Sequence, residues 1–223
     1  MNKHLKYNAL FRQKDSSIIY PYLTLYTYPW DLIPHLKNII VTLSADLDPE
    51  DYHCPEEGVY ISKKATVHQS ATVIGPCIIM EGSELRPGAY IRGGVLIGRG
   101  CVIGNSCEIK NSAIFDGAQI PHFNYVGDSI IGYKAHLGAG AITSNQKSDK
   151  SSVTVLNFGQ KTPTGLKKLG ALVGDRAEIG CGCVLNPGTV IGRGATVYPL
   201  SSVRGFVEEK SIYKSDRLTV RKS

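Results

Sequence analysis

Aliphatic residues recur at every sixth position over long stretches of this sequence. The series begins at Ile61 and runs to Ile109, continues at Ile131, and runs again from Val173 to Val203. A second series of mostly small residues follows four positions behind, including Ala65, Ala71, Cys77, Ser83, Ala89, Cys101, Cys107, Ala177, Cys183 and Ala195. Residues six apart do not stay on one stripe of an α-helix. The pattern instead predicts a parallel β-helix in which three six-residue faces complete each coil.

The predicted fold class is all-β: a left-handed parallel β-helix of hexapeptide repeats, with a short helical N-terminal segment and a projecting loop. We expect an aromatic-rich, helical cap segment over 1–55, the β-helix over 56–205 with an insertion loop at 146–170, and a basic C-terminal tail at 206–223. Helical spacing follows Asp31, which is a suitable capping residue. Because a solenoid needs its end covered, we expect this helix to close the open end of the β-helix.

Composition narrows the class of protein. The 223 residues are 42% hydrophobic with a net charge of +6, and they contain neither an Arg-rich arm nor an apolar run near the ~18 residues of a membrane span. We therefore expect no nucleic-acid or membrane partner and a cytoplasmic location. Of the six cysteines, Cys77, Cys101, Cys107 and Cys183 occupy the small inward position and are predicted to pack as apolar groups. Cys54 and Cys181 fall outside it.

Two places interrupt the repeat, at about 115–130 and at about 145–171. Flat β-helix faces offer no pocket, so a site is expected at an interruption or between neighbouring β-helices. At the first interruption His122 is followed by Asn124, Tyr125 and Asp128 and preceded by Glu108 and Lys110. A histidine near a carboxylate and cations suits a general base for an amine that lies beside a phosphate. A surface histidine in a loop is the alternative.

The segment 108–145, EIKNSAIFDGAQIPHFNYVGDSIIGYKAHLGAGAITSN, resembles the acetyltransferase domain of the bifunctional glucosamine-1-phosphate N-acetyltransferase/N-acetylglucosamine-1-phosphate uridylyltransferase family. The later TGLKKLGALVGD (164–175) is most similar to the archaeal-type branch. The resemblance covers roughly 60–205. Its HxxYxGD and GAGxITxN motifs are much more specific than the six-residue repeat itself.

The resemblance implies roles for individual residues. His122 would be the general base, oriented by Glu108. The substrate-binding residues would be Arg92, Lys110, Tyr125, His136, Asn145 and Lys168. For the phosphate-binding arginine, Arg86 in LRPG is the second candidate, but Arg92 has the family's spacing to Lys110.

The resemblance also implies a donor and an assembly. Acetyl-CoA would be the co-substrate, no metal would be needed, and its arm would lie between subunits of a homotrimer. Cofactor-binding residues would be Gly138, Ala139, Gly140, Cys181 and Arg204. An amide of the glycine-rich stretch could receive an oxyanion. Lys210, Lys214, Arg217, Arg221 and Lys222 add basic charge near the C-terminus, where a solvated tail is the alternative.

The sequence departs from the family at three places. His136 stands where the family has Asn, and Cys181 stands at a Ser-like position; the first leaves the acceptor open. The nucleotide-binding domain that precedes the family's acetyltransferase half does not fit into 55 residues, and PWDL (29–32) resembles the connector that follows such a domain. We therefore expect no UDP-sugar synthesis by this chain alone.

The resulting hypothesis is an acetyl-CoA-dependent N-acetyltransferase acting on an amino-sugar phosphate such as glucosamine-1-phosphate. Three alternatives stay open: a non-catalytic relative that binds a sugar nucleotide or a partner, an O-acetyltransferase, and a metal enzyme of the carbonic anhydrase type. The last requires three histidines around a metal. Only His122 and His136 lie near each other in the repeat.

Overall fold

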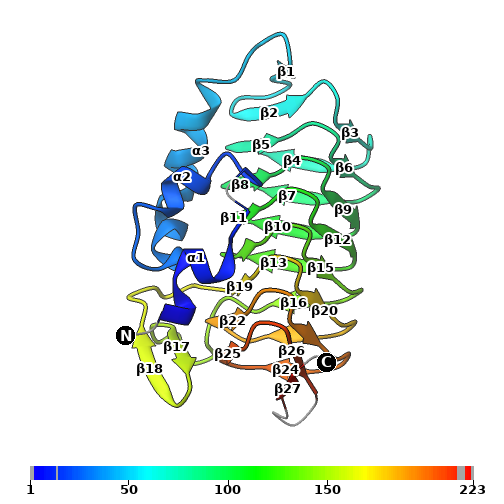
Figure 1. Ribbon diagram of the computed structural model, residues 1–223. Coiled ribbons are helices and arrows are strands. Elements are labelled where there is room, and N and C mark those ends of the chain that lie inside the picture. The colour runs from blue at the N-terminus through cyan, green and yellow to red at the C-terminus, as the bar shows by residue number, and fades with distance from the viewer. Residues whose placement is uncertain (1–2, 14, 215–218, 222–223) are drawn as a thin grey trace.

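The protein is a three-sided parallel β-helix with a helical segment packed along one side, in a computed structural model that describes residues 3–13, 15–214 and 219–221 (Figure 1). The predicted fold class, a left-handed parallel β-helix of hexapeptide repeats, is confirmed. The backbone of these residues forms three long sheets, called A, B and C below, and each coil contributes one short strand to each sheet in turn.

Successive coils stack in register, which brings the aliphatic residues of the repeat into vertical columns. Sheet A aligns Ile61 with Ile79 and Ile79 with Ile97, and the same column continues through Ile114 and Ile131. Side chains alternate in direction along a strand, so the residues between these point outward. The inward residues form one continuous, almost fully buried core.

The strands of the three sheets have the following bounds. Sheet A contains β1 (Tyr52–His53), β2 (Val59–Ser62), β5 (Cys77–Ile79), β8 (Val95–Ile97), β11 (Ser112–Ile114), β14 (Ile130–Ile131), β19 (Ala171–Val173), β22 (Thr189–Ile191) and β25 (Phe206–Val207). Sheet B contains β3 (Thr66–Val67), β6 (Glu84–Leu85), β9 (Val102–Asn105), β12 (Gln119–His122), β15 (His136–Leu137), β20 (Glu178–Ile179), β23 (Thr196–Val197), β26 (Ser211–Tyr213) and β27 (Thr219–Arg221). Sheet C contains β4 (Thr72–Ile74), β7 (Tyr90–Arg92), β10 (Glu108–Lys110), β13 (Tyr125–Gly127), β16 (Ile142–Thr143), β21 (Val184–Leu185) and β24 (Ser202–Val203).

The interruption predicted at 115–130 is a change of coil length, and no loop leaves the β-helix there. Early coils repeat every 18 residues, whereas Cys107 and Asn124 are stacked neighbours 17 apart. The missing residue belongs to the corner between sheets C and A. Two left-handed glycines, Gly93 and Gly94, make this corner in an early coil, and single left-handed residues, Asn111 and Asp128, make it in the next two. His122 itself is not in a projecting loop, because it is the last residue of strand β12 in sheet B.

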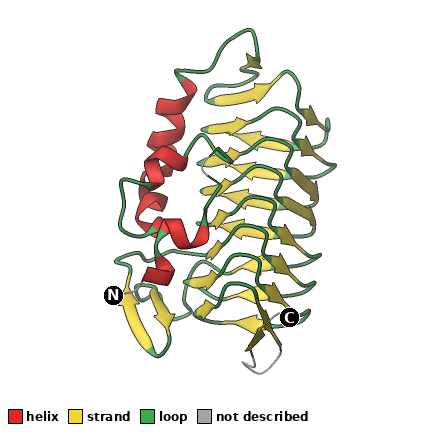
Figure 2. Cartoon of the chain, viewed as in Figure 1, coloured by secondary structure: helices red, strands yellow, loops and turns green. Residues whose placement is uncertain are grey.

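The N-terminal segment lies along the outer face of sheet A and does not cover the end of the β-helix, so the expected position of the cap was wrong (Figure 2). It contains η1 (Lys3–Leu5), α1 (Tyr7–Leu10), α2 (Tyr20–Leu23), η2 (Pro29–His35) and α3 (Leu36–Ser44). The outward residues of sheet A are themselves apolar and pack against this segment; they include Ile78, Leu96, Ala113, Ile130, Leu172 and Val190. An apolar outer face must be covered, and this requirement decides where the segment lies.

The insertion at 146–170 contains an antiparallel hairpin, β17 (Thr154–Asn157) and β18 (Gln160–Pro163), beside β22 and β25. Its Val153 and Val155 are buried in the layer between sheet A and the N-terminal segment. The predicted start of a tail at residue 206 is wrong, because β25 and β26 continue sheets A and B of the β-helix. Arg217 and Lys222, expected to contribute basic charge, lie outside the described residues.

The cysteine prediction is confirmed. Cys77, Cys101, Cys107 and Cys183 are fully buried in the core. Cys54 and Cys181 are exposed, and all six cysteines are free thiols.

Candidate functional site

The corner between sheets B and C carries His122. This residue ends β12, and its side chain is exposed. Phe123 follows with a left-handed backbone (φ +52°) and turns the chain toward β13. The His122 carbonyl oxygen accepts a hydrogen bond from the Gly140 amide of the next coil at 2.9 Å. The base predicted from the sequence is thus held through its backbone, with its imidazole facing outward.

Asn124 fixes this corner from inside. It stands four residues after Ile120, where other coils have a small residue, and it is only 2% exposed. Its Oδ1 accepts from the His122 amide at 3.0 Å, and its Nδ2 donates to the carbonyls of Gly138 (2.8 Å) and Ala141 (3.1 Å). A buried amide is tolerated when its polar atoms are satisfied in this way. The sequence analysis noted Asn124 beside His122 without giving it a role.

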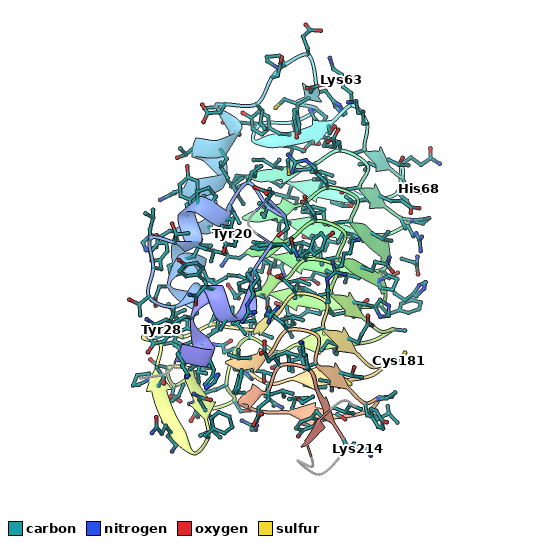
Figure 3. The ribbon with its side chains drawn as sticks, viewed as in Figure 1. Tyr20, Tyr28, Lys63, His68, Cys181 and Lys214 are labelled. Atoms are coloured by element: carbon teal, nitrogen blue, oxygen red, sulfur yellow. The ribbon has the colours of Figure 1, made fainter. Side chains whose placement is uncertain are left out.

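The stretch Gly138-Ala139-Gly140 lies in the coil next to His122. The Gly138 amide donates to the Ile179 carbonyl at 2.7 Å, and the Gly140 amide is used by His122. Within the described part of the chain, the amide of Ala139 is the one of the three without an acceptor. One coil further, Gly182 donates to the Ala139 carbonyl, which places the exposed Cys181 at the same corner. Cys181 lies at the edge of the molecule opposite the N-terminal helices (Figure 3).

The outer face of sheet C carries most of the predicted substrate-binding residues. Arg92 ends β7 and Lys110 ends the neighbouring strand β10. Glu108 is aligned with Tyr125 and accepts a hydrogen bond from Arg92 Nη1 at 2.6 Å. This hydrogen bond raises the pKa of the Arg92 guanidinium. Glu108 therefore contacts the predicted phosphate ligand Arg92 in this structure, whereas the resemblance implied that it orients His122.

Of the two candidate arginines, Arg92 shares a face with Lys110 and Arg86 does not. Arg86 follows β6 of sheet B and forms a bidentate pair with Glu84, with distances of 3.1 and 3.2 Å. The structure thus places Arg92 beside the other predicted phosphate ligand.

The corner between sheets C and A adds a partly buried polar cluster to this face. Asn145 Nδ2 donates to the Tyr125 hydroxyl at 3.2 Å and to Asp128 Oδ2. Asp128 Oδ1 accepts from Asn111 Nδ2 at 2.7 Å. Burial raises the pKa of the Tyr125 hydroxyl, and the nearby carboxylates of Asp128 and Glu108 add to the shift. The hydroxyl is therefore kept protonated and available as a hydrogen-bond donor.

Lys168 and Arg204 lie near this edge of sheet C. Lys168 is exposed and directly precedes Leu169, whose amide donates to the Asn145 carbonyl at 2.9 Å. Arg204 is exposed and follows β24, two strands further along sheet C than β16.

His136 lies apart from these residues on the outer face of sheet B. Its Nδ1 is 3.1 Å from Glu178 Oε2, and the two residues are aligned on neighbouring strands. A shallow depression beside them is bordered by Gln119 and Lys134. Among the described residues, a histidine pairs with a carboxylate at His136–Glu178, on the face next to His122.

The described residues contain neither a cluster of metal ligands nor a membrane-spanning helix. Over 3–13, 15–214 and 219–221, no three His, Cys, Asp or Glu side chains come together as metal ligands. No helix of this part of the chain is long and apolar enough to span a membrane.

Fold and corner together define a hexapeptide-repeat β-helix protein, and comparison with known proteins agrees with the resemblance inferred from the motifs. A family model described as the GMPPB C-terminal domain matches residues 73–158. The chain is similar to the bifunctional protein GlmU of Methanococcus aeolicus, with 31% identity over 86% of this chain and 47% of that protein. GlmU of Methanococcus maripaludis is 36% identical over 49% of this chain and 26% of its own length. The predicted resemblance to the acetyltransferase domain of GlmU-like proteins is confirmed.

The chain spans less than half the length of these curated relatives. Among solved structures, a mutant of AntD, an N-acyltransferase from Bacillus cereus, matches 78% of this chain and 91% of its own with a TM-score of 0.40 and 18% identity. A mutant of perosamine N-acetyltransferase from Caulobacter crescentus matches 70% of this chain and 52% of its own, with a TM-score of 0.32 and 21% identity.

Proposed function

We propose that this chain transfers an acetyl group from acetyl-CoA to the amine of an amino-sugar phosphate, with glucosamine-1-phosphate as the first acceptor to test. The similarity to GlmU proteins supports the reaction class. The observation that carries the proposal is local. An exposed imidazole, that of His122, and an amide without an acceptor, that of Ala139, stand on adjacent coils of one corner.

These two groups suit the two demands of amide formation. An amine attacks a thioester only as the free base, so His122 would take the proton that the nitrogen loses. Negative charge would develop on the thioester oxygen, and the Ala139 amide is a donor that needs no reorganisation to receive it. The carbon–sulfur bond of the thioester then breaks, and CoA leaves as the thiol after taking the proton from the protonated His122 imidazole. Asn124, which bonds to both segments, would act as a positioning residue.

The acceptor's phosphate would bind on sheet C. Lys110 and Arg92 lie on neighbouring strands, and the protonated Tyr125 hydroxyl adds a donor, with Asn145 and Lys168 at the adjacent corner. Glu108 neutralises part of this charge through its pair with Arg92. A bound phosphate would compete with Glu108 for the guanidinium, and the released carboxylate would be available to the substrate amine or to His122.

The donor would extend along the corner past Cys181, with Arg204 as a ligand for its phosphates. Faces of a single β-helix form only shallow sites, so we place the complete site between neighbouring copies in a homotrimer. A cytoplasmic location, where acetyl-CoA is available, belongs to the same proposal.

The test is acetylation of glucosamine-1-phosphate by the purified chain, followed by product mass and release of CoA. His122→Ala is expected to lower the rate by about 100-fold or more, the usual contribution of a general base. His68→Ala is the matched control, because His68 is also an exposed histidine of the β-helix and, among the described residues, its imidazole hydrogen-bonds only to Ser70.

Three results would change the proposal. Native rates in His122→Ala would overturn its role as base. Acetyl-CoA binding without turnover of this acceptor would overturn glucosamine-1-phosphate as substrate and direct the assay to other phosphorylated or nucleotide-linked amines. A chain that does not bind acetyl-CoA would be a binding protein built on the same fold.

A further inference from the structure

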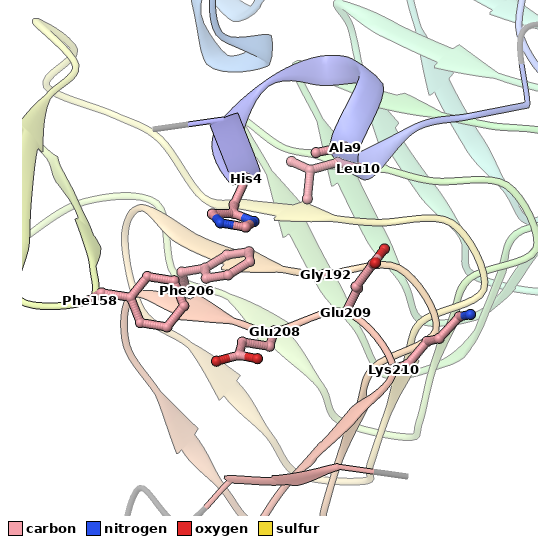
Figure 4. Close-up of a pocket in the computed structure, with 9 residues that line it drawn as sticks. All are labelled: His4, Ala9, Leu10, Phe158, Gly192, Phe206, Glu208, Glu209 and Lys210. Carbon is pink, nitrogen blue, oxygen red and sulfur yellow. The ribbon is translucent and has the colours of Figure 1, made fainter. Parts of the chain in front are cut away.

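A cavity that contains no residue of the corner at His122 lies where three distant parts of the chain meet near the last coils. It has a volume of about 460 Å³, within the range of small-molecule sites. η1 and α1 form one wall, the insertion hairpin a second, and the coil after β25 the third (Figure 4). Its lining comprises His4, Ala9, Leu10, Phe158, Gly192, Phe206, Glu208, Glu209 and Lys210.

One side of the cavity is an aromatic wall. His4, Phe158 and Phe206 come from three separate elements, and their ring centroids lie 5.7 to 6.0 Å apart. The Phe158 ring stands at 72° to that of Phe206 and at 79° to that of His4. Phe158 nevertheless remains 65% exposed. Phe158 thus meets the other two rings edge to face, whereas His4 and Phe206 are tilted at 33°, and the exposed Phe158 ring leaves apolar surface open toward the cavity and solvent.

The other side carries two carboxylates, Glu208 and Glu209, and the ammonium group of Lys210. Glu208 and Glu209 directly follow β25. Glu209 is paired with Arg193 at 2.6 Å, and Arg193 is held further by the Ala9 carbonyl. The carboxylate of Glu208 has no hydrogen-bond or ion-pair partner in the part of the chain described, although the residue is half-buried. Its charge is therefore available to a ligand, with Lys210 bordering the cavity.

From this arrangement we propose that the cavity binds a small organic cation, an ammonium group carried on a compact apolar body. Aromatic faces attract a cation electrostatically, and the contribution grows when water is displaced. Glu208 supplies the matching charge, and the aromatic wall accepts the apolar body. The inference is independent of the proposed transferase activity, because no residue of this cavity belongs to the corner at His122 or to sheet C.

The probe is choline, compared with 3,3-dimethylbutan-1-ol, which has the same shape without the charge. Binding to the full chain is followed by calorimetry and by the resonances of the labelled protein. We expect choline to bind and the neutral alcohol to bind at least tenfold more weakly. Phe158→Ala and Glu208→Gln are each expected to weaken choline at least fivefold. Phe158 is largely exposed and Glu208→Gln keeps the size of the side chain, so both variants should fold.

Two controls make the result specific. Leu156→Ala removes another partly exposed apolar residue of the same hairpin outside the cavity lining, and Glu178→Gln removes an exposed carboxylate on sheet B. Both should bind choline as the native chain does. Equal affinity for choline and the neutral alcohol would overturn the charge recognition. Choline binding that is absent, or that survives both cavity substitutions, would overturn the site.

Discussion

Exposure divides the six cysteines into two chemical groups. Burial raises the pKa of Cys77 and of Cys101 to about 12, and it also raises the pKa of Cys107 and of Cys183. The thiolate is the reactive form, so these four thiols are protonated and unreactive at pH 8. Cys54 and Cys181 are open to solvent. Cys181 belongs to the corner at His122, so its rate of alkylation can report whether a ligand covers the candidate donor site.

Alkylation of the native chain at pH 8 should modify Cys54 and Cys181 and leave the other four until the protein is denatured. If the donor lies along the corner, CoA should slow modification of Cys181 several-fold without affecting Cys54, the internal reference. Peptide mass spectrometry measures both sites in one sample. Modification of Cys77 or Cys101 in the native state would contradict the burial, and equal rates at Cys181 with and without CoA would contradict the donor path.

At the scale of elements, the carboxylate of Asp175 forms several of the hydrogen bonds that link the N-terminal segment to the β-helix. Asp175 Oδ2 accepts from the amides of Arg12 (2.7 Å) and Gln13 (3.3 Å), and its Oδ1 accepts from the amide of Tyr133 at 3.0 Å. Burial raises the pKa of this carboxyl, although the three amides and Arg193 oppose the shift. Close by, the ring of Phe11 packs on Phe115 at a centroid distance of 5.2 Å.

Asp175→Ala is expected to destabilise the chain by about 1 to 3 kcal/mol, because it leaves three partly buried amides without this acceptor. Hydrogen exchange should accelerate in residues 9–13 while sheet C is unchanged. Asp149→Ala is the control, since Asp149 bonds only within its own exposed turn. Equal melting temperatures for the native chain and Asp175→Ala would show that apolar packing alone holds the segment.

At the scale of the whole molecule, the corner between sheets B and C exposes large apolar side chains. Phe123 is 62% and Leu200 84% exposed, and both have left-handed backbones at this corner. The N-terminal segment covers sheet A only, so sheets B and C are the faces left for contacts between copies. Exposed apolar residues gathered at one edge are typical of an interaction surface.

If the chain assembles as the proposed homotrimer through this edge, light scattering should give three times the monomer mass. Leu200→Glu should shift the population toward monomers and reduce acetyl transfer with it. Leu25→Glu changes a residue that is 74% exposed on the N-terminal segment and should leave the assembly intact. A native monomer with full activity would exclude a site that needs two copies.

The period of the aliphatic residues predicted the fold class from sequence because stacked coils outside the insertion place residue i next to a residue 16 to 18 positions later. Each buried column is therefore visible as a local repeat. The four inward cysteines followed from the same rule. Specific motifs also led to His122, Tyr125 and Asn145, which the structure brings to two neighbouring corners. Asn124 could also have been predicted to have a structural role, because a polar residue stands there in an inward position of the repeat.

Only the tertiary structure decided contacts that depend on side-chain direction or on distant segments. The repeat does not reveal which outer face the helices cover, because that follows from the apolar outward residues of sheet A meeting one segment in space. The spacing of residues does not predict that Glu108 bonds to Arg92 or that His136 bonds to Glu178. Each of these side chains has several polar neighbours on the adjacent coils, and side-chain direction decides which one it contacts. The cavity joining His4, Phe158 and Phe206 has no local pattern at all. The periodicity of the sequence predicts the features that every coil repeats. Contacts between segments that are unrelated in sequence are seen only in the tertiary structure.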